Sequence, residues 1–348
     1  MMETNKTRVV WIDVLKGWLL IMVCGSHMGM NPFYWKPINS VFYCCVPIFF
    51  IVSGYLFSLK KYYKVSTLLN SKVKTLFIPY VSLCILTILL DTSSYSKVGI
   101  LSNLNRAFVE CLGTNKAGPL WFLYALFMCN ILGWLLMVKV HSTYVRCIML
   151  LLLGSLSYTL SIYGIKFPFM LNTIPSFIVM YVSGYEIKRY VNMQNMGINN
   201  LTPPKKTIIS GILLFIGLSC SFLKYGDMHL NKLHYFPICY ISPICLFVSI
   251  HSFMSQHNFI TCKCADKFIK FLLWLARSGT EFLAFHMFLL FLYDKIGAMF
   301  ELPDEINFLF KFVFTLSLFY LIIVPFANNF LYRLLGKDKI AWSDNYIK

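Results

Sequence analysis

Three ionisable residues lie in one apolar stretch near the beginning of the chain. Asp13, Lys16 and His27 belong to the segment WIDVLKGWLLIMVCGSHMGM, residues 11–30. Ionisable side chains in so apolar a segment cost free energy to bury, and they usually face the interior of a helix bundle or a water-filled cavity. Imidazole is the side chain whose pKa suits proton transfer near neutral pH. His27 is therefore a candidate general base.

The spacing of these residues places them on one side of a helix. Asp13 and Lys16 are three residues apart, so they can form an ion pair. Eleven helical steps of about 100° bring His27 to within roughly 20° of Lys16, at a rise of about 16 Å. In the alternative, Asp13 and Lys16 extend to the membrane interface and His27 only hydrogen-bonds a neighbouring helix. The shared face favours a functional cavity.

The composition indicates that membrane-spanning helices position these residues. The chain has 348 residues, of which 58% are hydrophobic and 13% are charged. Average soluble domains carry about a quarter of charged residues, so this chain has too little polar surface for a water-soluble globule. We predict an all-α polytopic membrane protein, with residues 1–348 as a single integral-membrane domain and a short, partly embedded apolar segment at 268–276. About ten transmembrane helices are expected, at 11–30, 40–59, 73–91, 118–138, 144–163, 171–187, 206–223, 234–253, 280–297 and 307–332.

The basic residues predict the orientation of the helices. The formal net charge is +17, but Lys and Arg lie in short loops between the apolar segments and not in one patch, which argues against nucleic acid as a partner. If the N-terminus is cytoplasmic, the inner segments hold more than twice as many Lys and Arg as the outer loops. This bias predicts that both termini lie in the cytoplasm.

The cysteines do not predict a metal site. Most of the twelve lie in apolar segments, where cysteine acts as a small hydrophobic residue. Cys262 and Cys264, with His251 and His257 upstream, loosely resemble a ligand cluster, but their spacing matches no standard zinc pattern. We expect no metal, and a metal cluster is the less favoured alternative.

Five motifs in order along the chain resemble the integral-membrane acyltransferase family 3, which includes fucose 4-O-acetylase-like proteins and polysaccharide O-acetyltransferases. The first is the opening helix WIDVLKGWLLIMVCGSH, in which Lys16 and His27 fit a basic residue, ten intervening residues and a histidine, although the family usually has arginine at the first position. Three further segments resemble the family pattern: VPIFFIVSGYLF (46–57), KTLFIPY (74–80) and GPLWFLYALF (118–127).

The fifth motif lies near the end of the chain. The segment LARSGTEFLAFH (275–286) resembles a penultimate family segment, with Arg277, Glu281 and His286 at the matching positions. Ser278, Gly279 and Leu283 depart from the family pattern, which puts the chemistry of the helix start in doubt more than Glu281 or His286.

The resemblance implies transfer of an acyl group, usually acetyl, from a coenzyme A thioester to a sugar hydroxyl. In the family the donor is thought to be used from the cytoplasmic side, and many acceptors are cell-surface glycans or their lipid-linked precursors. We therefore expect a multi-pass protein of the bacterial cytoplasmic (inner) membrane. Its expected partners are acetyl-CoA as the donor co-substrate, a saccharide acceptor and membrane lipids.

The resemblance and the residue types suggest roles for the individual side chains. His27 would remove the proton of the acceptor hydroxyl or, alternatively, carry the acyl group transiently. Lys16, paired with Asp13, would meet an anionic part of the donor. Basic residues expected to bind coenzyme A are Lys60, Lys61, Lys64, Lys72, Lys74 and Arg277.

For the other candidate residues, a role in helix packing explains the residue type as well as a role in the site does. Glu281 and His286 either face the site or make interhelical hydrogen bonds. Trp121, Ser53 and Tyr55 are candidates for substrate binding, with helix packing as the alternative. A transporter or flippase for a lipid-linked saccharide is the competing function, but it requires neither acyl-CoA nor the alignment of Lys16 with His27. A structural assembly protein would leave the ionisable residues of the first helix unexplained.

Overall fold

The computed structural model of the chain describes residues 9–28, 36–90, 118–192, 202–223, 227–233, 235–254, 263–297 and 303–335. These residues form helices and turns without a β-strand. The helices are α1 Val10–His27, α2 Lys36–Leu56, α3 Val65–Lys72, α4 Ile78–Leu90, α6 Trp121–Lys139, α7 Thr143–Ile162, α8 Ile174–Asn192, α9 Pro203–Leu223, α10 Ile238–Met254, α11 Lys263–Arg277, α12 Gly279–Gly297, α13 Asp304–Leu318 and α14 Val324–Phe326. Single π-helical turns join α3 to α4 and flank α14, at Val73–Phe77, Phe319–Ile323 and Ala327–Leu331.

Five of the described helices are long and apolar enough to cross a membrane. They are Val10–His27, Trp121–Lys139, Thr143–Ile162, Pro204–Phe222 and Ile306–Leu331. The pair α11 and α12, bent by 90°, makes a sixth candidate. The all-α, apolar character is confirmed. The expected count of about ten spans is not confirmed, because several helices at the predicted positions are too short or too polar to pass on length and composition. The cytoplasmic position of the termini stays a prediction.

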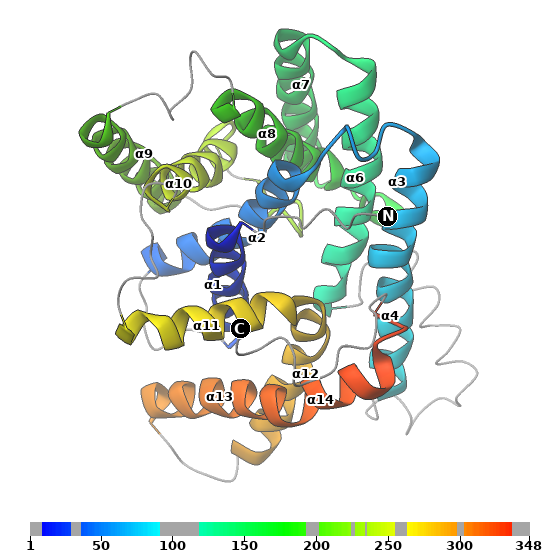
Figure 1. Cartoon of the computed structure of the whole chain (residues 1–348), viewed down its shortest axis with the longest axis vertical. Helices are drawn as coiled ribbons and strands as arrows, with labels where there is room; N and C mark the ends of the chain where they lie inside the picture. Colours follow the sequence, from blue (N-terminus) through cyan, green and yellow to red (C-terminus); the bar gives the residue numbers. More distant parts are fainter. Residues whose placement is uncertain are drawn as a thin grey trace.

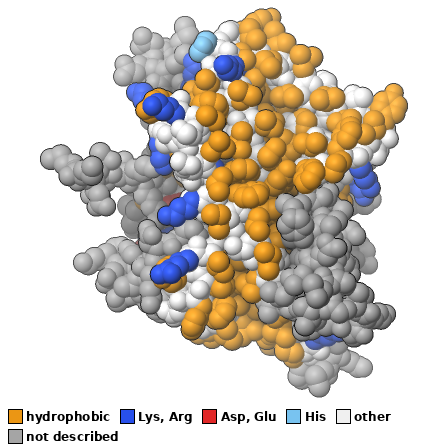
Figure 2. Space-filling view, turned by 90° about the vertical axis from the view of Figure 1, so that its right-hand side faces the viewer, with side chains coloured by type: hydrophobic (Ala, Val, Ile, Leu, Met, Phe, Trp, Pro, Cys, Tyr) orange, Lys and Arg blue, Asp and Glu red, His pale blue; other side chains and the backbone are white. Residues whose placement is uncertain are grey.

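The surface of the molecule carries a broad apolar band. Figure 2 shows hydrophobic side chains filling the middle of one face, with Lys and Arg side chains mainly along one edge of it. Large apolar side chains that are more than half exposed occur on several helices, among them Leu152 of α7 and Phe215 of α9. A soluble protein rarely exposes so large an apolar surface, whereas lipid tails solvate it readily.

α1 lies near the centre of the molecule, with α2 and α12 beside it and α11 crossing it (Figure 1). Gly17 allows the crossing, because a Cβ atom at this position would collide with the backbone carbonyl of Leu272. α11 buries Leu272 and Leu275 and keeps Lys270 on its exposed side, in an ion pair with Asp266 at 2.8 Å. This amphipathic helix corresponds to the short apolar segment that the sequence predicted ahead of the ninth span.

The sharp bend after α11 sends the chain back alongside α1. Gly279, the first residue of α12, lies against Leu20, and a Cβ atom there would be 3.3 Å from Leu20 Cδ1. Seven residues further along each helix, His27 and His286 are again neighbours. α12 therefore runs parallel to α1 for two turns, which brings together two histidines that are far apart in the sequence.

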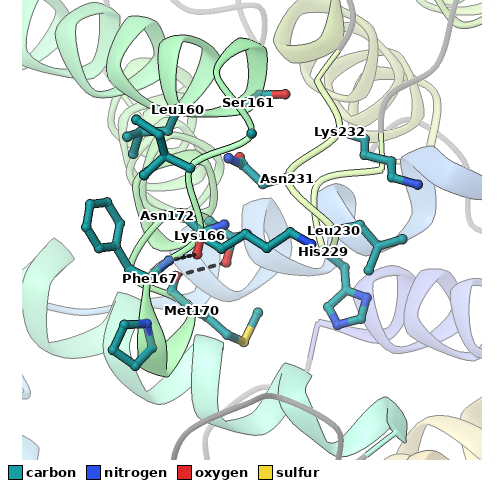
Figure 3. A pocket seen from close by; sticks show the side chains of 14 residues that line it. Leu160, Ser161, Lys166, Phe167, Met170, Asn172, His229, Leu230, Asn231 and Lys232 are labelled. Atoms are coloured by element: carbon teal, nitrogen blue, oxygen red, sulfur yellow. Dashed lines mark hydrogen bonds between the residues drawn. The ribbon is translucent and has the colours of Figure 1, made fainter.

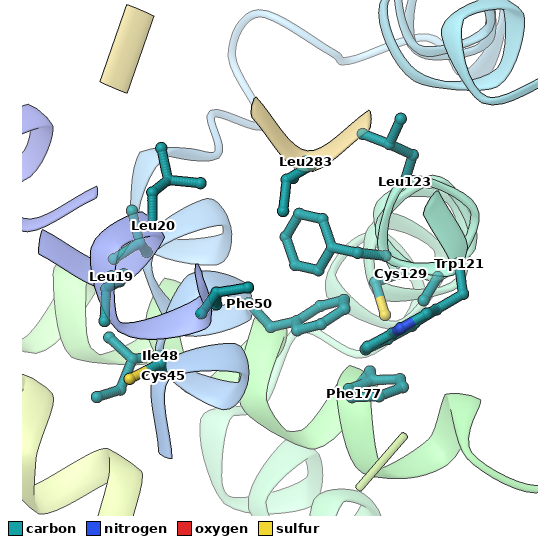
Figure 4. Close-up of a cluster of buried hydrophobic side chains, with 14 of the residues drawn as sticks. Leu19, Leu20, Cys45, Ile48, Phe50, Trp121, Leu123, Cys129, Phe177 and Leu283 are labelled. Carbon is teal, nitrogen blue, oxygen red and sulfur yellow. The ribbon is translucent and has the colours of Figure 1, made fainter. Parts of the chain in front are cut away.

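A buried cluster of apolar side chains supports the same end of α1. It combines side chains of α1, α2, α6, α8 and α12, including Leu20, Phe50, Trp121 and Leu283 (Figure 4). The Phe50 and Phe177 rings stack with centroids 4.4 Å apart, and the Trp121 and Phe177 rings stack at 5.5 Å. This stacking fixes the position of the Trp121 ring, which matters for the site described next.

Candidate active site

Two histidine rings meet at the C-terminal end of α1, called here the His27 end. The centroids of the His27 and His286 rings are 5.3 Å apart. His27 is exposed, whereas His286 is fully buried. One ring can therefore reach a substrate while the other can act only on its immediate neighbours.

The hydrogen bond of His286 defines the tautomer of its neutral ring. Its Nδ1 lies 2.8 Å from the carbonyl oxygen of Phe282, one helical turn earlier. A carbonyl oxygen can only accept a hydrogen bond, so Nδ1 carries the proton and Nε2 of the neutral ring has a free lone pair. This Nε2 is buried and has no hydrogen-bond partner among the described residues. His286 thus presents an acceptor in the immediate surroundings of His27.

His27 lines a small apolar cavity. The cavity has a volume of about 40 Å³, which is enough for a water molecule or a hydroxyl group but not for a sugar ring. Its wall includes Val46 and Phe49 of α2, Trp121 and Phe122 of α6, and Leu283 of α12, beside Val23, His27 and Pro119. Only His27 and Trp121 of these residues have polar side-chain atoms.

The Trp121 ring stacks on a histidine from the loop between α9 and α10. The centroids of the Trp121 and His229 rings are 4.2 Å apart and their planes differ by 13°. The Asp227 carboxylate accepts hydrogen bonds from the backbone N–H groups of His229 at 2.9 Å and Leu230 at 3.2 Å, which holds this turn in place. Burial lowers the pKa of His229, the Asp227 carboxylate opposes this, and His27 lowers the pKa further. His229 is therefore neutral at pH 7.

A larger pocket adjoins His229. It has a volume of about 910 Å³ and lies between the connection from α7 to α8 and the loop between α9 and α10. Figure 3 shows the side chains of Lys166, Lys232 and His229 around it. Because His229 lines this pocket and Trp121 lines the small cavity beside His27, the Trp121–His229 stack lies between the two spaces.

The predicted ion pair of the first helix forms at the other end of α1, called here the Trp11 end. Lys16 Nζ lies 3.3 Å from Asp13 Oδ1, and the side chains are 29% and 10% exposed. Lys16 is separated from His27 by about 16 Å of helix. The pair does not touch His27, so any joint role requires a substrate that extends along α1.

The remaining predicted basic residues also lie away from His27. The loop after α2 begins at the Trp11 end, because Tyr55 packs on Trp11 with ring centroids 6.1 Å apart. The Lys61 and Lys72 ammonium groups lie 4.8 and 5.3 Å from the centre of the Tyr62 ring. The five predicted lysines thus gather around this loop, α3 and the π-helical turn that follows: Lys60, Lys61, Lys64, Lys72 and Lys74.

Arg277 and Glu281 flank the bend between α11 and α12. Arg277 ends α11, and Glu281 is in the first turn of α12 with only 2% exposure. α11 crosses α1 at Gly17, and α12 starts beside Leu20. Along the axis of α1, Arg277 and Glu281 therefore lie between the ion pair and His27. The structure therefore groups Arg277 with Glu281 and not with the lysines.

Of the three residues predicted to bind substrate, the structure places only Trp121 beside His27. Ser53 Oγ donates to the carbonyl oxygen of Phe49 in its own helix at 2.8 Å. The Tyr55 hydroxyl lies 3.0 Å from Nε2 of His251, at the Trp11 end. The sequence suggested His251 only as a metal ligand, and Cys262 and His257 of that cluster lie outside the described residues.

Sequence reasoning missed Asp227, His229 and the two lysines of the larger pocket. They lie in two connecting segments without a periodic pattern, and nothing local to the sequence relates the loop after α9 to the first turn of α6. The density of polar residues in GDMHLNKLH, residues 226–234, was the one available signal.

Comparison with known proteins identifies the family. Residues 9–327 match the family model described as an acyltransferase domain, which includes the segments that hold His27 and His286. No curated protein and no solved structure matches the chain. The family match does not separate fucose 4-O-acetylase-like proteins from other members. The chain belongs to acyltransferase family 3, and the protein is accordingly an acyltransferase.

Proposed function

We propose that this membrane acyltransferase moves an acyl group, most simply acetyl, from a coenzyme A thioester to a hydroxyl group of a cell-surface or lipid-linked saccharide, with His27 as the general base. The observation that carries the proposal is the pairing of an exposed imidazole, at a cavity of hydroxyl size, with a buried neutral imidazole whose Nε2 can only accept a hydrogen bond. The family match gives no support to the transporter alternative.

The proposed reaction begins with the acceptor hydroxyl in the small cavity. A nitrogen of His27 takes the hydroxyl proton as the oxygen attacks the thioester carbonyl carbon, a step worth about 10²–10⁴-fold in rate for a well-placed base. The tetrahedral intermediate then collapses, the C–S bond breaks, and the imidazolium of His27 returns the proton to the leaving thiolate. The products are the saccharide ester and free coenzyme A.

His286 is proposed to hold His27 in the reactive tautomer. A reorientation of the exposed His27 ring lets it donate its N–H to the lone pair on His286 Nε2. The other nitrogen of His27 is then unprotonated and faces the acceptor. This is the role that an orienting partner plays for the histidine of other acyl-transfer sites, in which the tautomer decides the rate.

The ends of α1 suit the two ends of the donor. Coenzyme A separates its phosphate groups from its thioester by the long pantetheine arm. The lysines at the Trp11 end would attract the phosphate groups, while Lys16 and Arg277 lie on the way toward His27. An extended donor therefore accounts for the separation of the predicted residues along α1.

The test uses purified protein in lipid nanodiscs, acetyl-CoA and a panel of saccharides. Release of free thiol and a mass increase of about 42 Da on the saccharide report covalent acetyl transfer. We expect His27→Ala to lower kcat by about 10²–10⁴-fold. His141→Ala, at an exposed histidine between α6 and α7, is the matched control and should keep the parental rate.

Two results would overturn the proposal. Parental activity in His27→Ala removes His27 as the base, and thiol release without a mass gain on any saccharide removes the saccharide as the acceptor. A covalent acetyl group on the protein in the absence of acceptor, lost in His27→Ala, would instead select the acyl-carrier version of the mechanism.

A further inference from the structure

We infer that the 910 Å³ pocket beside His229 is the acceptor site and that its ligand is an anionic saccharide, with a carboxylate or phosphate group close to the hydroxyl that is acylated. This inference rests on the proposed function and names the acceptor class for the same site. It is carried by the position of the pocket, by its size and by the kind of polar groups on its wall.

The position follows from the Trp121–His229 stack. His229 belongs to the wall of the pocket, and Trp121 belongs to the wall of the cavity that contains His27. A saccharide in the pocket would therefore contact His229, whose ring stacks on the Trp121 ring beside His27. A displacement of the His229 side chain would admit one hydroxyl group to the small cavity while the rest of the sugar stays behind.

The sizes of the pocket and of the small cavity indicate that they bind different parts of the acceptor. About 910 Å³ falls in the range of typical ligand pockets, roughly 300–1,000 Å³, and suits a sugar of one or two rings. The cavity at His27, with about 40 Å³, excludes the ring. The pocket therefore binds the body of the acceptor, and the cavity receives the reacting group.

The charge of the wall indicates an anion. Lys166 and Lys232 come from separate connecting segments, and the described residues that line the pocket include no Asp or Glu. Neither lysine forms an ion pair with a described residue. The nearby Asp227 carboxylate already accepts two backbone hydrogen bonds. Two cationic groups on one cavity wall without an acidic counterpart favour an anionic ligand.

The neutral polar side chains of the pocket wall also favour an anionic ligand. Asn172 Oδ1 accepts a hydrogen bond from the backbone N–H of Phe167 at 3.3 Å, and Asn231 Oδ1 accepts one from the Ser157 hydroxyl at 3.2 Å. Both residues are largely buried, and each side-chain oxygen already accepts one hydrogen bond and keeps one lone pair, so the two N–H bonds of each amide are the larger part of what they offer to a ligand. Carboxylate and phosphate oxygens are acceptors only, and they match a wall of donors.

The experiment measures binding first and transfer second. Saturation-transfer NMR on the full-length protein in nanodiscs compares three probes: methyl glucoside, methyl glucuronide and glucose 1-phosphate. We expect the two anionic probes to bind at least tenfold more tightly than the neutral glucoside, with an affinity that weakens as salt is raised. Preference for the glucuronide or for the phosphate identifies which anion the site uses.

The test variants remove the positive charges of the two pocket lysines. The double variant Lys166→Gln/Lys232→Gln should raise the Kd and KM of the anionic probe at least tenfold while kcat and the binding of methyl glucoside stay unchanged. The matched arginine double variant should restore binding. Lys139→Gln, at an exposed lysine at the end of α6, is the control and should behave like the parent.

The outcomes separate this inference from the proposed function. Equal binding of neutral and anionic probes, or unchanged binding in the double variant, overturns the anionic acceptor even when acetyl transfer occurs. Selective anion binding without transfer to any saccharide would uphold the pocket and overturn the proposed reaction.

Discussion

Two clusters of histidine and aromatic side chains lie at opposite ends of α1. At the Trp11 end, the His251 ring packs edge-on against Trp11, with centroids 5.2 Å apart, and hydrogen-bonds the Tyr55 hydroxyl. At the His27 end, His27 faces His286 and shares a cavity with Trp121. Both clusters join helices that are distant in the sequence.

The clusters differ in what their histidines can reach. His251 is only 3% exposed and is enclosed by rings from α1, α2 and α10. His27 is exposed and lines a cavity next to a pocket of ligand size. We therefore expect a membrane histidine to serve chemistry where a nitrogen reaches space that a substrate can enter, and to hold helices together where aromatic rings enclose it.

After His27 itself, the largest effect is expected for the orienting histidine at the His27 end. His286→Ala should lower kcat by about 10-fold to 100-fold with little change in KM, because His27 loses the partner that selects its tautomer. Steady-state kinetics measure this. The double variant with His27→Ala should be no slower than His27→Ala alone, since the two act as a unit. Losses that multiply would show that His286 acts independently of His27.

Substitutions of Lys16 test whether a positive charge at the Trp11 end contributes to the use of acetyl-CoA. Lys16→Met should lower kcat/KM for acetyl-CoA about tenfold and should reduce thermal stability, because the buried Asp13 loses the partner 3.3 Å away. Lys16→Arg should stay within about threefold of the parent, since it keeps the cation and the ion pair. Titration with acetyl-CoA distinguishes the variants. Equal activity of both would remove Lys16 from the mechanism.

A smaller effect on activity is expected for the enclosed cluster. Tyr55→Phe removes the hydrogen bond to His251 and should cost about 1 kcal/mol of stability, seen as a lower melting temperature, with kcat and KM unchanged. Thermal unfolding followed by tryptophan fluorescence, together with kinetics, checks this. A raised KM for the saccharide would instead favour the sequence hypothesis that Tyr55 binds substrate.

The smallest expected effect is the pH dependence of the Kd for the anionic saccharide. Burial lowers the pKa of His229, so this ring is neutral from pH 7 upward, while lysines stay charged to about pH 10. The Kd for methyl glucuronide should therefore be constant between about pH 7 and 9 and should fall slightly only at a pH below the ordinary histidine pKa of about 6.5, where His229 gains a proton. His229→Phe keeps a ring against Trp121 and should abolish the tightening at low pH. Tightening that persists in this variant would assign it to another group.

The sequence predicted the parts of the structure that depend on local spacing. Apolar runs predicted helices near the observed positions, and the three-residue spacing of Asp13 and Lys16 predicted their ion pair. The motifs around His27 and His286 predicted the family that the match over residues 9–327 confirms. The orientation in the membrane and the roles of individual residues remain predictions.

Other features could not be predicted, because they depend on how helices cross. Gly54 and Gly184 allow α2 and α8 to approach until each glycine faces the backbone of the other helix. Such close contacts set the depth and register of a helix pair, but the sequence does not say which glycine meets which helix. The separation of Tyr55 from Trp121, both expected to bind substrate, follows from the antiparallel placement of α1 and α2.

By itself, the sequence determined that the chain folds into apolar helices and that one of them carries an ion pair and a histidine on one face. These properties follow from residue type and the helical repeat, which act over a few turns. The tertiary structure alone decided that His286 and the Trp121–His229 stack meet at His27. That meeting depends on the bend after α11 and on the glycine contacts that set the register of α12 beside α1, and packing between distant segments leaves no local period in the sequence.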